Sequence, residues 1–252
     1  MCGRYASARA KQELLEEFQV ELDAADQELR PDYNVAPTKP VYAVLSRVPK
    51  SAPESRPIRQ LRVLRWGLVP AWAKDPSVGS KMINARVETV AEKPAYRRAF
   101  AERRCLLPAD GYFEWAVLDE KDAKGKPKKQ PYFVRPKDGG VMAMAGLYEF
   151  WRDRGRPEDD PLAWLTTCTV ITTTAVDEAG TVHDRMPMLI EHDRWGEWLD
   201  PGVPDARDFL IPAGSTGLEI YPVSTAVNSV RNNGPELVEP LKEGGGDSQE
   251  LF

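Results

Sequence analysis

The sequence contains few of the residues that build disulfides and metal sites. Its cysteines are an odd set at wide spacing, Cys2, Cys105 and Cys168, which argues against a disulfide framework and indicates a reducing compartment, the cytoplasm. Its only histidines are His183 and His192, and it has neither a CxxC nor an HxxxH pair. We therefore expect no structural zinc site, and no metal or organic cofactor.

Long hydrophobic runs are also missing. No apolar stretch approaches the roughly 18 residues of a membrane helix, and the amino terminus has no apolar segment of the signal-peptide type. The hydrophobic content of 42% and the charged content of 29% are ordinary for a soluble globular protein. We expect a protein that does not bind a membrane.

Repeats and clear interdomain linkers are absent from the 252 residues. Short strand-like segments outnumber helical ones, and they do not alternate regularly with helices. This pattern predicts one compact α+β domain.

Charge is unevenly distributed along the chain. The net charge is −5, yet the stretch from Arg56 to Arg104 holds twelve basic and four acidic side chains, a local +8 that leaves −13 elsewhere. A basic region on an acidic protein can bind phosphates while the remaining surface repels indiscriminate contacts. The alternative is an ordinary solvated surface held by salt bridges.

Cys2 directly follows the initiator methionine. Removal of Met1 would leave Cys2 with a free α-amine beside its thiol. Because an α-amine has a pKa near ~8 and a thiol near ~8.5, both would be partly nucleophilic at neutral pH. Such an aminothiol condenses with an aldehyde to an imine, and the thiol then closes a thiazolidine ring with a large effective molarity. The alternative is a frayed terminus without a function.

Three further segments could contribute chemistry. Asn84 and Arg86 would share a face of an extended strand, offering an amide and a planar fork to phosphates. Glu114 lies between two aromatic residues, whose desolvation would raise its pKa and suit it to acid–base work. His183 lies in a loop and could donate a proton to a leaving oxygen. The alternatives are a structural Asn–Arg pair, a solvent-facing glutamate and a surface histidine.

Aromatic side chains suggest contacts with unpaired bases. Trp66 and Trp72 lie in the loop-like segment WGLVPAW, and Tyr112 and Trp115 flank Glu114. Stacking of a base on such a ring contributes ~1–3 kcal/mol. The alternative for each ring is packing in the core.

Several segments of the chain together carry a resemblance to one family. They are Met1–Tyr5 (MCGRY), Tyr33–Thr38 (YNVAPT), Arg65–Pro70 (RWGLVP), Asn84–Glu88 (NARVE), Arg104–Pro108 (RCLLP), Gly111–Trp115 (GYFEW), Ala145–Leu147 (AGL) and His183–Pro187 (HDRMP). Their order and spacing resemble the SRAP proteins (SOS-response-associated peptidases), which include sensors of abasic sites in single-stranded DNA. Residues 119–129 and the acidic end of the chain lie outside the pattern.

The resemblance implies a fold and its limits. We expect a single α+β domain over residues 2–230, with a curved, barrel-like mixed β-sheet core and a few flanking helices. Residues 231–252 would form a C-terminal extension with a disordered acidic tail. The protein would act as a monomer in the cytoplasm, associated with the nucleoid if it is bacterial.

The resemblance also implies an activity and roles. Cys2 would capture an abasic site in single-stranded DNA as a thiazolidine crosslink after Met1 removal, with Glu114 and His183 as the other catalytic residues. The alternative is a thiol autopeptidase that uses Cys2. The residues expected to contact DNA are Arg4, Asn34, Trp66, Trp72, Asn84 and Arg86.

Overall fold

The computed structural model describes residues 2–49, 52–121, 123–203, 205–210 and 217–241. Its centre is a β-barrel of five strands: β4 (Pro40–Arg47), β5 (Ile58–Trp66), β7 (Arg104–Ala109), β10 (Met142–Arg152) and β11 (Trp164–Thr174). Neighbours pair antiparallel in the order β5–β4–β7–β10–β11. Parallel pairing of β11 with β5 then closes the ring, with Cys168 opposite Trp66.

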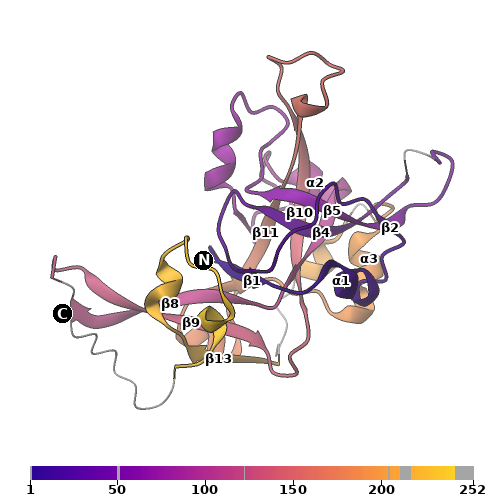
Figure 1. The fold of residues 1–252 in the computed structure, drawn as a ribbon. Helices are drawn as coiled ribbons and strands as arrows, with labels where there is room; N and C mark the ends of the chain where they lie inside the picture. Colours follow the sequence, from indigo (N-terminus) through magenta and orange to yellow (C-terminus); the bar gives the residue numbers. More distant parts are fainter. Residues whose placement is uncertain (1, 50–51, 122, 204, 211–216, 242–252) are drawn as a thin grey trace.

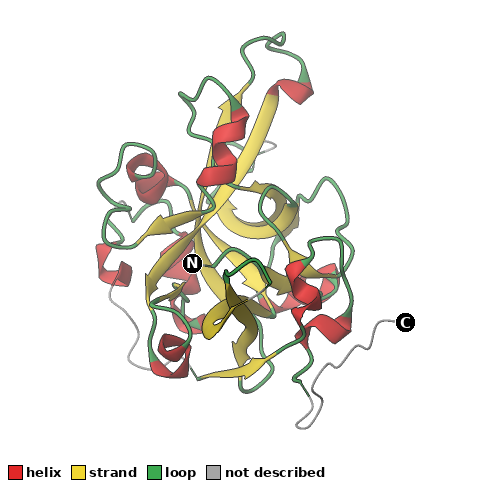
Figure 2. Cartoon of the chain, turned by 90° about the vertical axis from the view of Figure 1, so that its left-hand side faces the viewer, coloured by secondary structure: helices red, strands yellow, loops and turns green. Residues whose placement is uncertain are grey.

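Strand alternation separates the inside of the barrel from its outside. On β4, Val41, Ala43 and Leu45 pack in the core that all five barrel strands share, whereas Tyr42 and Val44 pack against helices. The helices α1 (Lys11–Glu17), α2 (Arg97–Glu102) and α3 (Trp195–Leu199) cover that outer face. They lie around the strands in Figure 2.

The inside of the barrel holds two of the cysteines. Cys105 and Cys168 are free thiols with no exposed surface. Burial raises the pKa of both thiols, so they remain protonated and inert. The barrel is tight here, because a Cβ placed on Gly146 would lie 2.9 Å from the Cys105 sulfur.

A second sheet packs beside the barrel. Its strand order is β13 (Leu218–Pro222), β9 (Pro127–Pro136), β8 (Gly111–Lys121), β1 (Tyr5–Ser7) and β3 (Asp32–Val35). Its inner face, including Tyr112 and Val134, joins the barrel core. Its outer face packs on a small cluster with Phe113, Phe133 and Leu237. Figure 1 shows this sheet as a separate layer below the barrel.

Short elements complete the chain. These are β2 (Leu22–Asp23), β6 (Asn84–Arg86), β12 (Arg185–Pro187) and the 3-10 turns η1 (Pro76–Lys81), η2 (Pro161–Ala163), η3 (Asp177–Thr181), η4 (His192–Arg194), η5 (Arg207–Leu210), η6 (Thr225–Asn228) and η7 (Pro235–Val238). In the described part of the chain, no helix has the length and apolar character to cross a membrane. The expected α+β fold with a barrel-like core is confirmed.

The C-terminal extension is partly built into the domain. Leu237 has no exposed surface and packs in the outer cluster of the second sheet. The backbone N–H of Leu241 donates to the carbonyl of Pro222 at 2.9 Å. The expected acidic tail, residues 242–252, lies outside the described residues.

Candidate functional site

The terminal residues of the chain are held in place by the second sheet. Strand β1 pairs with β8, with Tyr5 opposite Tyr112, and the N–H of Phe113 donates to the carbonyl of Arg4 at 2.9 Å. Two residues further along this register, Glu114 lies beside the segment that leads to Cys2. The frayed-terminus alternative is therefore wrong for Cys2, which has no exposed surface.

Asn84 holds Cys2, the first described residue of the chain. Its side-chain Nδ2 donates to the carbonyl oxygen of Cys2 at 2.7 Å. Strand β6 carries Asn84 and Arg86 on one face, with the fully buried Ala85 on the other. The predicted shared face is confirmed, but Asn84 contacts the terminal cysteine, whereas Arg86 is exposed.

Glu114 is a buried carboxyl at the centre of the site. Only 5% of Glu114 is exposed, so the solvent-facing alternative is wrong. Burial raises the pKa of Glu114, and the positive charges of the amino terminus and of His183 act in the opposite direction. Burial, followed by the charge of Glu114, raises the pKa of the Cys2 thiol. Glu114 thus interacts electrostatically with both Cys2 and His183, which are distant from it in sequence.

This burial changes one expectation about Cys2. An ordinary thiol would be partly ionised at neutral pH, whereas the raised pKa keeps the buried Cys2 thiol protonated. An α-amine would therefore be the first nucleophile, and the thiol would bring its own proton to the second step.

His183 is oriented through its Nδ1 atom. The backbone N–H of Arg185 donates to Nδ1 at 3.0 Å, and the Asp184 carboxylate lies 2.8 Å from the same atom. These contacts fix the orientation of the ring. With 30% of its side chain exposed, His183 can exchange a proton with a bound molecule.

Strand β11 brings the two site loops together. Its residues from Val170 to Thr172 pair with β6, and those from Thr172 to Thr174 pair with β12, which follows His183. Arg185 forms an ion pair with Glu88 and donates to the Thr172 carbonyl. The sequence did not single out Arg185 or Glu88 as site residues, although they lie in the segments HDRMP and NARVE.

The chain is similar to known proteins along most of its length. The sequence profile of SOS response associated peptidase (SRAP) matches residues 1–230. This chain belongs to the SRAP family. The SRAP chain is 39% identical over 243 residues to YoaM of Bacillus subtilis, which is named an abasic site processing protein; the match covers 95% of this chain and 98% of YoaM.

A vertebrate relative and a solved bacterial structure are also similar to this chain. HMCES of Xenopus tropicalis, also named an abasic site processing protein, is 31% identical over 244 residues, covering 87% of the SRAP chain and 69% of HMCES. A crystal structure of a protein from Bacteroides thetaiotaomicron matches with a TM-score of 0.76 at 24% identity, covering 96% of this chain and 100% of that one. That likeness concerns the fold alone.

Two of the expected DNA contacts are wrong for this SRAP chain. Trp66 has no exposed surface, its Nε1 donates to the Ile83 carbonyl at 2.9 Å, and the edge of its ring packs against Tyr5. It cannot stack on a base. Asn34 is also fully buried, and its amide is bonded within the protein. Trp72, by contrast, is 66% exposed.

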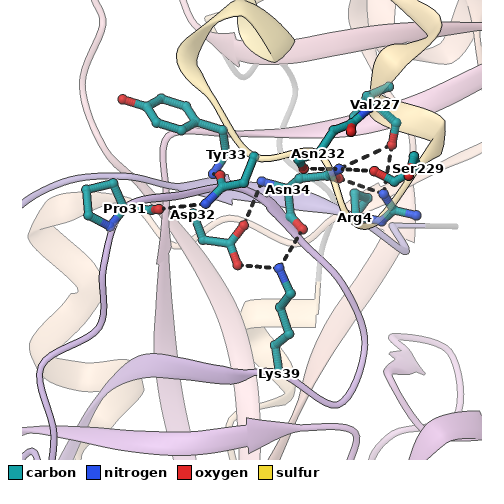
Figure 3. A network of polar contacts seen from close by, with 10 residues as sticks. Arg4, Pro31, Asp32, Tyr33, Asn34, Lys39, Val227, Ser229 and Asn232 are labelled. Atoms are coloured by element: carbon teal, nitrogen blue, oxygen red, sulfur yellow. Dashed lines mark hydrogen bonds and ion pairs between the residues drawn. The ribbon is translucent and has the colours of Figure 1, made fainter.

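Arg4 lies at the edge of the site and is partly committed. Its Nη1 donates to Asn34 Oδ1 at 2.6 Å and to the Val227 carbonyl at 2.9 Å, and its guanidinium lies 5.8 Å from the centre of the Trp115 ring. Burial lowers the pKa of Arg4, with the charge of Asp32 acting against this. Figure 3 shows the hydrogen bonds of Arg4 to Asn34 and Val227.

Part of the basic stretch between Arg56 and Arg104 is engaged inside the protein. Arg104 is 4% exposed and donates to backbone carbonyls near the ends of α2 and α3. Arg103 pairs with Glu149 at 3.0 Å in partly buried surroundings. For these side chains the salt-bridged or structural alternative holds, whereas Arg86 remains on the surface of the site.

Proposed function

We propose that this protein processes abasic sites by capturing them covalently in single-stranded DNA through Cys2, once Met1 has been removed. The observation that carries the proposal is the position of Glu114. A buried carboxyl acts on the thiol of a residue whose carbonyl Asn84 holds at 2.7 Å. The names of the relatives YoaM and HMCES support the same lesion as substrate.

The first step is opening of the abasic sugar. The C1′–O4′ bond breaks, His183 donates a proton from Nε2 to O4′, and the proton of the C1′ hydroxyl passes through solvent water to replace the one that His183 gave up. The product is an aldehyde at C1′. Exposed Arg86 would bind the phosphates beside the lesion, and exposed Trp72 would stack on a flanking base.

The second step is condensation. Glu114 accepts a proton from the Cys2 ammonium, and the freed amine attacks C1′. A second amine proton moves to the former aldehyde oxygen, Glu114 returns its proton to the resulting C1′ hydroxyl, which leaves as water, and a protonated imine remains. A carboxyl with a raised pKa suits both transfers, because its carboxylate is a stronger base than an ordinary glutamate and can carry the accepted proton near neutral pH.

The third step closes the ring. The Cys2 sulfur forms a bond to C1′ of the protonated imine, and the thiol proton passes to the Glu114 carboxylate. The thiazolidine contains no imine, so it cannot promote the β-elimination that would break the strand. We expect the protein to act as a monomer.

Intact-protein mass spectrometry and denaturing gels test the proposal. Protein lacking Met1 is incubated with an oligonucleotide that carries one abasic site. We expect an adduct of protein plus oligonucleotide minus one water, absent with undamaged DNA and with Cys2→Ala. No adduct from wild-type protein lacking Met1 would refute covalent capture.

The same spectra test the alternative, an autopeptidase. If wild-type protein lacks Met1 and Glu114→Gln retains it in the same host, the site itself releases Met1. If wild-type protein and Glu114→Gln lose Met1 equally, a separate aminopeptidase releases it.

A further inference from the structure

Asn34 is a buried amide whose side chain bonds in four directions. It has no exposed surface. Its Oδ1 accepts from Arg4 Nη1 at 2.6 Å, and its Nδ2 donates to the carbonyls of Val227, Ser229 and Asn232 at 3.3, 3.0 and 3.0 Å. Figure 3 shows these bonds converging on the amide. A buried amide whose groups are all engaged fixes the elements that it joins.

The loop bonded by Asn34 reaches both sides of the reacting pair. We name residues 226–233 the C-terminal latch. Arg4, two positions after the terminal cysteine, also donates to the Val227 carbonyl at 2.9 Å. Trp115, directly after the buried glutamate, donates from Nε1 to Asn228 Oδ1 at 2.7 Å. The latch therefore holds a near neighbour of each reacting residue.

The latch also closes the edge of the second sheet. Asn233 Oδ1 accepts from the N–H of Tyr33 at 2.8 Å, and Asn233 Nδ2 donates to the carbonyl of Pro31 at 3.1 Å. This amide pairs with the edge strand β3 much as a neighbouring strand would. The side chain of Val227 packs with Leu237 in the outer cluster and so attaches the latch to the second sheet. The latch is thus a fixed element against which Asn34 can hold Arg4.

We propose that Asn34 is a positioning residue of the capture reaction, which fastens Arg4 to the C-terminal latch and so holds Cys2 against Glu114. The inference rests on the proposed function. Its physical reason is the narrow tolerance of a reacting geometry, in which a displacement of about 1 Å costs ~100-fold in rate. Only Arg4 and Gly3 separate Cys2 from β1, so freedom at Arg4 passes directly to the nucleophile.

Crosslinking rates at increasing DNA concentration test the proposal. In Asn34→Ala lacking Met1, we expect the limiting rate to fall about 10- to 100-fold, with little change in the half-saturating DNA concentration. Arg86→Gln should show the opposite pattern. Val230→Ala, in the latch but 51% exposed, is the matched control and should behave as wild type. A wild-type limiting rate in Asn34→Ala would overturn the proposal, as would a change in half-saturation alone.

The pH dependence of the limiting rate separates positioning from loss of stability. The groups that act on Glu114 are the amino terminus and His183, and its own charge acts on Cys2 and Tyr112. Loosening the amino-terminal arm would admit water to Glu114 and lower its pKa. Because the limiting rate falls at low pH as the Glu114 carboxylate is protonated, this fall should move to lower pH in Asn34→Ala, and we call it the acidic limb of the profile. Leu14→Ala, a core change in α1, should lower stability without moving that limb. An unmoved limb in Asn34→Ala would contradict the proposal.

Two further measurements keep the inference separate from folding and from the proposed function. If Asn34→Ala does not fold, Asn228→Ala removes the exposed bond to Trp115, and should lower the limiting rate in the same direction. If wild-type protein forms no crosslink, the proposed function fails. Carbon-13 titration of the Glu114 carboxyl still decides the latch, because an equal pKa in wild type and Asn34→Ala would refute it.

Discussion

At the scale of single residues, burial decides the chemistry of the site. Cys2 and Glu114 are both removed from water, and burial is the largest cause of the raised pKa of each. Burial keeps the Cys2 thiol protonated and makes Glu114 a stronger base, as condensation and ring closure would require. His183 has a different role, because the backbone N–H of Arg185 donates to Nδ1 and so orients the ring at the site.

Replacing Glu114 by glutamine should change stability in a pH-dependent way. The folded pKa of Glu114 lies above its unfolded value, so its burial costs stability as pH rises through the folded pKa, and costs none below the unfolded pKa. We expect Glu114→Gln to melt at a higher temperature than wild type at about pH 8 and at the same temperature near about pH 4. Thermal unfolding across this range checks this, and a Tm difference independent of pH would contradict it.

At the scale of elements, glycines shape the loop that delivers Asn84. Gly67 ends β5 with a φ of +116°, and a Cβ there would lie 2.5 Å from the carbonyl oxygen of Gly79 in η1. Asp75 caps η1 by accepting from the N–H of Ser77 at 2.6 Å. The close contact between Gly67 and Gly79 lets the chain fold back after β5, so that β6 pairs with β11.

Gly67→Ala should therefore disturb both stability and the site. We expect a loss of about 2–3 kcal/mol from the positive φ and the clash together, together with slower crosslinking because Asn84 shifts. Gly125→Ala is the matched control: its φ is +75°, but a Cβ there meets nothing within 4 Å. It should cost about 1 kcal/mol and leave crosslinking unchanged. Equal losses in urea unfolding would show that the Gly79 contact is unimportant.

At the scale of the whole molecule, the second sheet lies between two apolar layers. The barrel core covers one face, and the cluster that contains Leu237 covers the other. The chain therefore uses residues beyond the 1–230 match to complete its core. The C-terminal latch, which spans the end of that match, lies beside Arg4 and Trp115 through bonds of Val227 and Asn228.

Leu237→Ala measures the contribution of this outer layer. We expect a loss of about 3 kcal/mol, which corresponds to a fall in Tm of roughly 5–10 °C for a chain of this size. Leu162→Ala, at a residue that is 74% exposed, makes the same chemical change on the surface and should alter Tm little. A wild-type Tm in Leu237→Ala would mean that the extension adds nothing to the core.

Sequence by itself determined the features that depend on local chemistry and alternation. These are the aminothiol that Cys2 would carry without Met1, the shared face of Asn84 and Arg86 on a strand, and the family with its α+β barrel. Each depends on residue type, on the period of a strand or on short ordered segments, and all of these are visible along the chain.

Tertiary structure alone decided which side chains meet and which are buried. Asn34 and Trp66 lie in segments that read as polar or loop-like, yet both are fully buried. Parallel pairing of β11 with β5 closes the barrel, and β11 also brings the loops of Asn84 and His183 together. Burial and convergence depend on contacts between residues far apart in the chain, so no local pattern of sequence determines them.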